Sequence, residues 1–461
     1  MMRLLALVLL WVLAALPASA ATNNILLIIS DDMGVDVSSF YRSSVRLPTT
    51  PTPPTLPNLR DLANGGVLFT KAWATPWCSS TRASMITGQY SFRHGVGETI
   101  DNGSPDLADA AVTLPRIVGD SSRNYVTRHI GKWHITSENN GPRNLGWQSG
   151  INNPPTEGGF PDPYDYFNWR SYTDGAGPTA RTTYALTFWV NEAISTINSA
   201  NTANRPYFIW LAINNPHAPF HRPPNDLHSR DTIPTTCTGA GCRPQYEAML
   251  EAMDTELGRL LDNVDLATTT VIFIGDNGTP NKIPVSPYTE AHGKGTTFTG
   301  GVHVPLIIAG QAVVNGGRTV NELVNCVDLF PTIVDLAGQA GNSRLTGVKI
   351  DGVTLLPYLQ NKTHPTPRRW AYAEQFNPNW NSTGWERTIR NGDFALIERQ
   401  DGTRDFYNIA VDPLEALIAE RTRERGPVAG PVTPVQPLLT AADPLGELIA
   451  KRSQALPGAG L

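Results

Sequence analysis

The 461-residue sequence predicts an α/β fold: a large mixed, mostly parallel sheet flanked by helices, plus a smaller C-terminal α+β domain with an antiparallel sheet. Two observations predict this fold. As far as residue 368, continuous apolar runs alternate with helix-like periods, which is typical of strands buried on both faces. From residue 369, short strand-like runs are separated by Asn-Gly and Asp-Gly, which are hairpin signals.

The first twenty residues have the pattern of a secretory signal peptide. Arg3 precedes an apolar run over residues 4–16, and small residues follow at 17–20. We therefore expect a signal peptide over 1–20, a first domain over 21–368, a second over 369–461, and a secreted or periplasmic protein. Since no later stretch of about 18 apolar residues occurs, we expect no membrane span. The net charge of −5, without a basic tract, argues against nucleic acid as a partner.

Apolar runs that end in polar residues predict the central strands. They lie at residues 24–30, 207–213, 270–274 and 306–309. Three of them end in polar groups, at Asp31-Asp32, at residues 214–217 and at Asp276-Asn277. Polar loops commonly follow strands, and this alone would explain any one of the three cases. It is a poor explanation for three such endings in one chain. Ligands of parallel sheets gather beyond the carboxyl ends of the strands, so we expect the site there.

Apolar periodicity predicts helices over residues 56–63, 183–197 and 246–262, the last with Met249, Met253 and Leu257 on one face. In the C-terminal part we expect strands at 370–374, 385–390, 394–398 and 406–409. A helix near 414–423, a Pro-rich stretch over 427–437 and a final short helix should follow.

The four cysteines fall into three settings. Cys237 and Cys242 bracket a short turn, where a disulfide is favoured in an oxidising compartment and two free thiols are the alternative. Cys326 lies in an apolar run and is expected to be buried and inert. Cys78 stands four residues before Arg82, at the predicted start of a helix. Free backbone N–H groups and a guanidinium there suit an anion and a reactive side chain, although most lone cysteines are small buried hydrophobes.

The polar groups at the strand ends include three carboxylates and an amide. Clustered carboxylates repel one another without a cation, so we expect a hard divalent ion, Ca²⁺ or Mg²⁺. The alternative makes the Asp-Asp pair a helix N-cap and Asp-Asn-Gly a turn. The predicted ligands are Asp31, Asp32, Asp276 and Asn277.

Basic and titratable residues occur in further short motifs. Lys132 and His134 stand two residues apart, which places both on one face of an extended segment. His217 and Lys294 follow later in the chain. Singly, such residues are usually structural or solvated. Together with Arg82 around a metal, they suit a tetrahedral oxyanion ester.

The ordered motifs resemble those of the type I sulfatases of the alkaline phosphatase superfamily. The resemblance runs from about Asn24 to the C-terminus and therefore covers nearly all of the predicted mature chain. It rests on residues 24–34, 78–88, 131–134, 275–278 and 293–302, with 407–415 similar to a typical C-terminal segment.

The resemblance implies hydrolysis of sulfate monoesters by a modified cysteine. Cys78 would be converted to formylglycine (3-oxoalanine) by a formylglycine-generating enzyme, and its hydrate would attack sulfur. Cys78 would also join the four oxygen ligands around Ca²⁺, with Mg²⁺ possible. Arg82, Lys132 and Lys294 would stabilise charge on the sulfate. His217 and Lys294 would protonate the leaving alcohol, and His134 would take the proton of the second hydroxyl.

Three positions depart from the family pattern. Ser80 stands where Pro or Ala is usual, Thr299 where Glu is usual, and His303 where Arg is common. Two other readings stay open: a phosphonate or phosphate monoester hydrolase of the same superfamily, and a non-catalytic anion-binding relative with unmodified Cys78. The resemblance implies a small-molecule or saccharide sulfate ester as the substrate, so that an arylsulfatase-like enzyme and a carbohydrate sulfatase both stay open. Aromatic residues that either line its pocket or belong to the core are Trp77, Trp133, Trp147, Trp169 and the segment 164–169.

Overall fold

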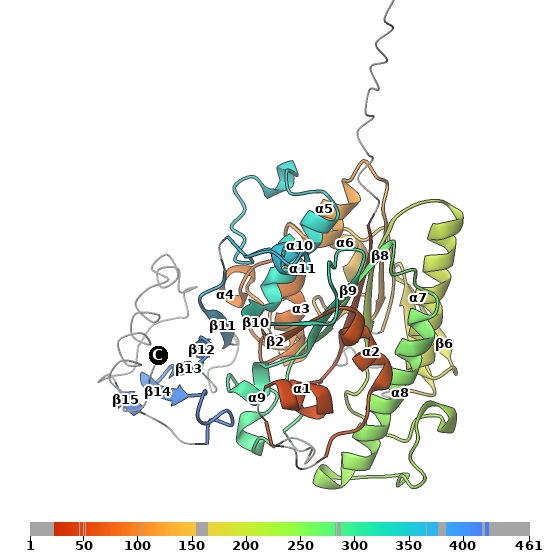
Figure 1. Ribbon diagram of the computed structural model, residues 1–461. Helices are drawn as coiled ribbons and strands as arrows, with labels where there is room; N and C mark the ends of the chain where they lie inside the picture. Colours follow the sequence, from red (N-terminus) through yellow and green to blue (C-terminus); the bar gives the residue numbers. More distant parts are fainter. Residues whose placement is uncertain are drawn as a thin grey trace, which may run out of the picture.

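A ten-stranded sheet forms the centre of the protein in the computed structural model (Figure 1). The structure describes residues 23–423 except residues 46, 49, 51, 103, 154–164, 282, 284–286, 366, 377–383 and 417–419. The predicted signal peptide, the Pro-rich stretch and the final short helix lie outside the described residues.

The large sheet is mixed, as the sequence predicts. It contains two sets of parallel strands. One set is the pair of β10 with β2, and the other consists of β8, β1, β7, β3 and β4, each paired with the next. The antiparallel strand β9 separates β2 from β8. At the far edge, β5 pairs antiparallel with β4, and β6 pairs antiparallel with β5. In spatial order the strands are β10 (Arg318–Asn325), β2 (Val67–Trp73), β9 (Leu306–Gly310), β8 (Thr269–Gly275), β1 (Asn24–Ser30), β7 (Tyr207–Ile213), β3 (Val126–Gly131), β4 (Ser149–Asn152), β5 (Trp169–Thr173) and β6 (Ala176–Arg181).

Helices cover both faces of this sheet, and β1 shows why its sequence is apolar throughout. Leu26 and Ile28 point into one core, while Ile25, Leu27 and Ile29 point into the other. The first core is closed by α2 (Pro57–Gly65), α7 (Ala185–Thr202) and α8 (Arg243–Leu261). The second is closed by α3 (Cys78–Thr87), α5 (Leu114–Gly119) and α10 (Leu329–Leu336). The short helices are α1 (Ser39–Ser44), α4 (Ser91–His94), α6 (Gly141–Asn144), α9 (Thr299–Val302) and α11 (Leu356–Leu359).

Four adjacent parallel strands end at one edge of the sheet. In the register of the pairs, Ser30 of β1 lies opposite Ile213 of β7 and Gly275 of β8, and Gly131 of β3 lies opposite Ala212. The residues that follow these ends are therefore brought together by the sheet itself. Gly131 is required at its position, because a Cβ there would lie 2.0 Å from the carbonyl oxygen of Ala212.

The second sheet is antiparallel and belongs to the C-terminal part. Its strands are β11 (Ala371–Gln375), β12 (Glu386–Arg390), β13 (Phe394–Arg399), β14 (Thr403–Asn408) and β15 (Glu420–Arg423). The predicted hairpins at Asn391-Gly392 and Asp401-Gly402 join β12 to β13 and β13 to β14.

The prediction of a helix near residues 414–423 is wrong. Residues Glu420–Arg423 form β15, which pairs with β14 in antiparallel register. The free edge of β14 offers unpaired backbone groups, and pairing with them outweighs the helix propensity of a segment too short to form a stable helix without tertiary packing.

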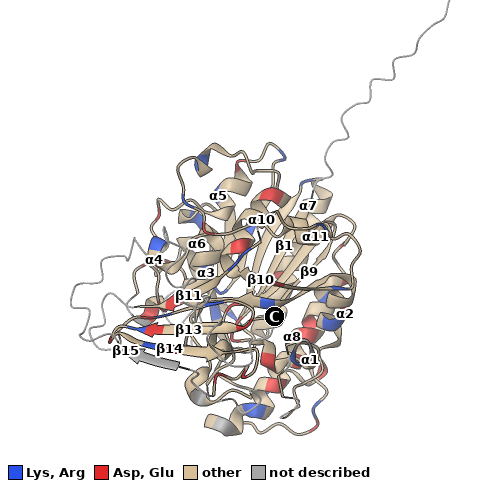
Figure 2. Ribbon diagram, turned by 60° about the vertical axis from the view of Figure 1, so that its left-hand side comes forward, with Lys and Arg blue, Asp and Glu red and all other residues tan. Residues whose placement is uncertain are grey.

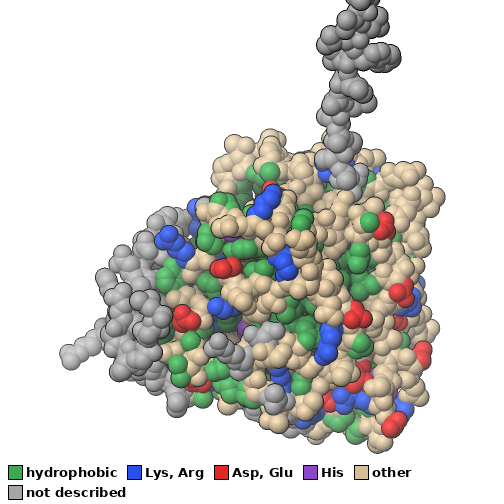
Figure 3. All heavy atoms as spheres, viewed as in Figure 1, with side chains coloured by type: hydrophobic (Ala, Val, Ile, Leu, Met, Phe, Trp, Pro, Cys, Tyr) green, Lys and Arg blue, Asp and Glu red, His purple; other side chains and the backbone are tan. Residues whose placement is uncertain are grey.

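The cysteines lie as the sequence predicts. Cys237 and Cys242 form a disulfide, and Cys326 is a buried free thiol. Among the described residues, none of the helices combines the length and apolar character needed to cross a membrane. Basic and acidic residues are interspersed along the ribbon (Figure 2), and on the face drawn in Figure 3 their described side chains are likewise mixed.

Candidate active site

The predicted site residues meet beyond the carboxyl ends of the four parallel strands. Asp31 and Asp32 follow β1, Asp276 and Asn277 follow β8, Lys132 follows β3, and His217 stands four residues after β7. Cys78 and Arg82 come from α3, and Lys294 from the loop before α9. Every one of these side chains is buried or nearly so, with Lys294 and His217 the most exposed at 13 %.

Cys78 is the first residue of α3, and Arg82 lies one turn later. The Arg82 guanidinium donates from Nε and Nη2 to one oxygen of Asp276, at 3.1 and 2.7 Å. Its Nη1 donates to the backbone carbonyl of Lys132 at 2.8 Å. Arg82 therefore ties the helix that carries Cys78 to two of the strand ends.

Two lysines complete the ring of positive charge around Cys78. Lys132 Nζ lies 2.5 Å from an Asp31 oxygen, and Lys294 Nζ forms an ion pair with Asp32. Lys294 Nζ also donates to Cys78 Sγ at 3.5 Å. A group bound beside Cys78 thus meets three cations whose positions are fixed by carboxylates.

Burial dominates the ionisation of Cys78. It raises the pKa of the thiol to about 12, although Lys132 and Lys294 favour the thiolate. Asp31 behaves in the opposite way: burial alone would raise its pKa. The nearby cations, led by Lys132, hold that pKa well below its usual range. The surroundings therefore favour an anionic Asp31 and a protonated Cys78 thiol.

Several of the buried oxygens have the properties of metal ligands. One ligand atom from each of Asp31, Asp32, Cys78 and His217 lies within 4.8 Å of the others. The side-chain oxygen of Asn277 is buried and has no hydrogen-bond partner among the described residues, while its amide nitrogen donates to Asp32. A buried oxygen without a donor is costly, and a hard cation would satisfy it. The residues present therefore fit a divalent ion.

Both side-chain oxygens of the predicted ligand Asp276 accept hydrogen bonds from the protein. One oxygen accepts the two Arg82 bonds, and the other accepts the backbone N–H of Asp32 at 3.1 Å. His217, whose expected role is proton transfer alone, lies within the cluster of possible ligand atoms. The sequence could not separate these roles, because only distances distinguish them.

His134 is held by a carboxylate that the sequence analysis does not identify. Its Nε2 lies 3.0 Å from Asp101, and a carboxylate only accepts, so Nε2 carries the proton. The buried Nδ1 then carries the lone pair, and it has no partner in the described part of the chain. His134 adopts the left-handed backbone conformation, with φ of 55°, which is uncommon for a residue other than glycine. Burial lowers the pKa of His134 to about 4.

His217 is oriented by its own backbone. Its Nδ1 donates to the carbonyl of Ala218 at 2.8 Å, so Nε2 is the atom that gains and loses a proton. Nε2 points toward Asp32, at 3.6 Å. Burial lowers the pKa of His217 to about 3.

Most of the aromatic residues considered for a substrate pocket belong to the core. Trp133, Trp147 and Trp169 are buried in the two cores of the large sheet. Trp77, next to Cys78, is partly exposed, and its indole N–H donates to Gln375 of β11 at 2.8 Å.

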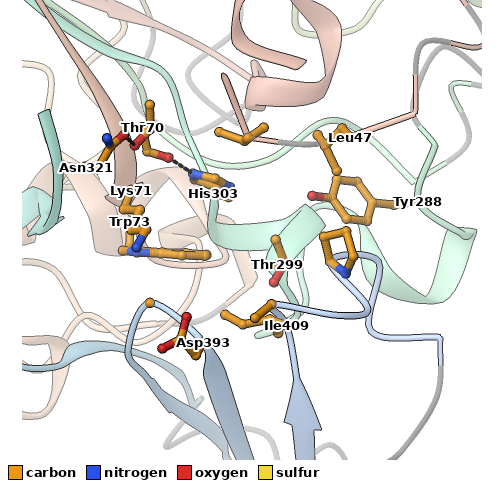
Figure 4. A pocket seen from close by; sticks show the side chains of 14 residues that line it. Leu47, Thr70, Lys71, Trp73, Tyr288, Thr299, His303, Asn321, Asp393 and Ile409 are labelled. Atoms are coloured by element: carbon orange, nitrogen blue, oxygen red, sulfur yellow. Dashed lines mark hydrogen bonds between the residues drawn. The ribbon is translucent and has the colours of Figure 1, made fainter. Parts of the chain in front are cut away.

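A cavity of about 390 Å³ lies between the large sheet and the C-terminal sheet (Figure 4). It contains none of the predicted catalytic residues, but it is lined by Thr299 and His303, two of the three positions that depart from the family pattern. His303 stacks on Trp73 and bonds to the carbonyl of Thr70. At the third such position, the Ser80 hydroxyl donates to the Trp77 carbonyl at 3.0 Å, inside the first turn of α3.

Comparison with known protein families gives one match over most of the chain. A family model described as Sulfatase matches residues 23–339. N-acetylgalactosamine-6-sulfatase of Canis lupus familiaris is 30% identical over 385 residues, which cover 75% of this chain and 68% of that protein. Arylsulfatase A of Bos taurus is 30% identical over 411 residues, which cover 80% and 73% of the two chains.

Solved structures show the same fold. The crystal structure of Ps i-CgsB in complex with k-i-k-neocarrahexaose has a TM-score of 0.69 and 23% identity, and the match covers 86% of this chain and 88% of that one. Phosphonate monoester hydrolase of Agrobacterium radiobacter has a TM-score of 0.63 and 21% identity, with 94% and 96% covered.

Proposed function

Because the chain belongs to the sulfatase family, we propose that it hydrolyses a saccharide sulfate monoester, releasing sulfate and the sugar alcohol. The family match makes the protein a sulfuric ester hydrolase. The saccharide is supported by the relatives: one is named N-acetylgalactosamine-6-sulfatase, and another structure holds its substrate D-glucosamine-2-N,6-O-disulfate.

The observation that carries the proposal is the ring of three cations around Cys78. A sulfate ester exposes three oxygens that share one negative charge, and charge on them and on the leaving oxygen changes during reaction. Arg82, Lys132 and Lys294 are held at fixed positions by Asp276, Asp31 and Asp32. Fixed charges cost little reorganisation at the moment of reaction, so they favour the transition state.

Two groups would complete the site. Asp31, Asp32, Asp276 and Asn277 with residue 78 would hold Ca²⁺, or Mg²⁺, and the bound ion would add positive charge beside a sulfate oxygen. Cys78, converted to formylglycine by a formylglycine-generating enzyme, would supply a hydroxyl as the nucleophile. The properties of the thiol support this conversion. Its pKa of about 12 keeps it protonated at neutral pH, so the unmodified Cys78 side chain would be a poor nucleophile.

The remaining steps are proton transfers by residues of the chain. Lys294 Nζ would donate a proton to the leaving alcohol, and His217 Nε2 would do so in its protonated form, which the negative charge of a bound sulfate ester favours. His134 Nδ1, whose lone pair is fixed by the bond from Nε2 to Asp101, would accept the proton of the second hydroxyl at residue 78.

We also propose that the protein acts outside the cytoplasm. The signal-like pattern at residues 1–20 and the disulfide between Cys237 and Cys242 support export to an oxidising compartment.

A substrate panel tests the proposal. The protein is co-expressed with a formylglycine-generating enzyme, and release of sulfate, phosphate or phosphonate is measured from sulfated sugars, aryl sulfates, phosphate monoesters and phosphonate monoesters. We expect the largest kcat/KM on a sulfated sugar and no turnover by Cys78→Ala. If kcat/KM is largest on an aryl sulfate, the proposed substrate is an aryl sulfate and not a saccharide sulfate. If kcat/KM is largest on a phosphate or phosphonate monoester, the proposal is contradicted.

A further inference from the structure

The loop that carries Lys294 has little regular structure of its own. It runs from Gly293 to the start of α9 at Thr299, and Gly295 within it adopts a left-handed conformation with φ of 81°. A lysine on such a loop needs contacts from elsewhere to hold its ammonium beside Cys78. Those contacts come from the C-terminal sheet.

Thr297, three residues after Lys294, is completely buried. All of its polar groups bond to side chains of β12. Its backbone N–H and its hydroxyl donate to one oxygen of Glu386, at 3.2 and 2.7 Å. Its carbonyl accepts from Nη2 of Arg390 at 2.6 Å. The first and last residues of β12 thus hold Thr297 from two sides.

The same network continues on either side of Thr297. Arg390 Nη1 donates to the hydroxyl of Thr299 at 2.7 Å, and the buried carboxylate of Glu415 accepts the Thr299 backbone N–H at 2.5 Å. Arg399 on β13 donates to the second oxygen of Glu386 at 2.9 Å, which fixes that carboxylate. The entry to α9 is therefore held by charged residues of the C-terminal part.

The helix that carries Cys78 is held by the neighbouring strand β11. Gln375 accepts the indole N–H of Trp77, the residue before Cys78. Gln375 lies directly opposite Glu386 in the pairing of β11 with β12. Trp77 in turn packs against Gly295, where a Cβ would lie 2.8 Å from the ring, and the Gly295 N–H donates to the Pro76 carbonyl.

From these contacts we propose that Glu386 and Arg390 are positioning residues that set the place of Lys294 relative to Cys78. Strand β12 is then part of the active-site framework, although neither residue contacts the predicted catalytic groups. This inference rests on the proposed function, because it assigns Lys294 a part in turnover.

Matched variants in one sheet test the inference. Glu386→Ala removes both bonds to Thr297, whereas Glu386→Gln keeps an accepting oxygen. Glu398→Ala is the control: Glu398 lies on adjacent β13 and pairs with Arg387 and Arg404, away from the Lys294 loop. Melting temperature and the converted fraction of residue 78 are measured for each, and kcat and KM are normalised to converted protein. The substrate is the one that the wild type hydrolyses best in the panel.

We expect Glu386→Ala to lower kcat by roughly 100-fold, with KM changed far less, since a small misplacement of a catalytic group has that effect. Glu386→Gln should recover most of the loss, and Glu398→Ala should keep the wild-type kcat. If Glu386→Ala does not fold, Thr297→Val replaces it, and a smaller loss of kcat with unchanged KM is expected.

A double-mutant cycle with Lys294→Ala separates the two claims. If Glu386 acts through Lys294, adding Glu386→Ala to Lys294→Ala should lower kcat no further. An equal loss in both backgrounds, or an equal loss in the Glu398 control, would overturn the positioning role. Unchanged turnover by Lys294→Ala would instead contradict the proposed mechanism, whatever Glu386 does.

Discussion

Cys78 lies among cations, yet its thiol is not activated. Lys132 and Lys294 favour a thiolate, but burial raises the pKa to about 12 and outweighs them. Reactive cysteines usually have a lowered pKa and some exposure, and Cys78 has neither. At the residue scale, the surroundings therefore suit a modified side chain better than a nucleophilic thiol.

Asp101 should matter for turnover because it fixes which nitrogen of His134 carries the proton. In Asp101→Asn the side-chain amide can turn its NH₂ toward Nε2, which would move the proton to Nδ1 and block the proposed base. We expect kcat to fall by roughly 100-fold, the lower part of the range for general base catalysis. Steady-state kinetics with His134→Ala as the reference measures this. A wild-type kcat for Asp101→Asn would contradict the role of Asp101.

At the scale of elements, four neighbouring strand ends assemble the site. β8, β1, β7 and β3 are parallel and adjacent, so the residues after them share one edge of the sheet. Helix α3 contributes Cys78 and Arg82 to that edge, and the bonds from Arg82 to Asp276 and to the Lys132 carbonyl lock the helix in place.

Calcium binding should stabilise the fold through the same strand ends. A ligand that binds only the folded state at about 100 times its Kd adds about 2.7 kcal/mol to the free energy of unfolding. We expect the melting temperature of the wild type to rise with Ca²⁺ and to fall when a chelator removes it.

Asn277→Ala deletes the unpaired oxygen and should shift this response to higher Ca²⁺ concentrations. Asn321→Ala, at a lining residue of the cavity in Figure 4, is the control and should respond like the wild type. An unchanged response of Asn277→Ala would remove Asn277 from the ligands.

The contact between β11 and α4 should depend on pH through Glu374. Burial raises the pKa of this carboxyl to about 7, even though its oxygens accept the Phe92 N–H and the Tyr372 hydroxyl. A raised folded-state pKa means that stability is fully present below the unfolded value of 4.5 and is lost as pH rises through 7.

Glu374→Gln stays neutral, so it should escape this loss. The difference in free energy of unfolding between Glu374→Gln and the wild type should increase in favour of the variant by up to about 3 kcal/mol from pH 4.5 to pH 8. Urea unfolding at both pH values measures the difference. A constant difference across that range would show that Glu374 does not titrate in the fold.

At the scale of the whole molecule, the sequence predicts what local patterns determine. The apolar runs at β1, β7 and β8 are buried on both faces, so their continuous hydrophobicity is informative. The Asn391-Gly392 and Asp401-Gly402 turns mark the C-terminal hairpins for a similar local reason.

Contacts between distant segments were not predictable in this way. Asp101 lies in a single turn of 3-10 helix (Ile100–Asn102), and no pattern in the neighbouring sequence indicates its contact with His134. In the sequence, Glu386 and Arg390 are ordinary residues at the two ends of a short strand. Only the packing of the sheet brings them into contact with Thr297. The error at residues 420–423 has the same origin, because the edge of β14 decided their conformation.

We expect sulfate ester hydrolysis by this protein to depend on conversion of Cys78 to formylglycine. Peptide mass spectrometry at residue 78, run on protein whose turnover of the preferred ester has been measured, tests it most directly. We expect activity to rise in proportion to the fraction of residue 78 with the lower mass of formylglycine, and unconverted protein to be inactive. Full activity in protein whose residue 78 is an unmodified thiol would contradict it.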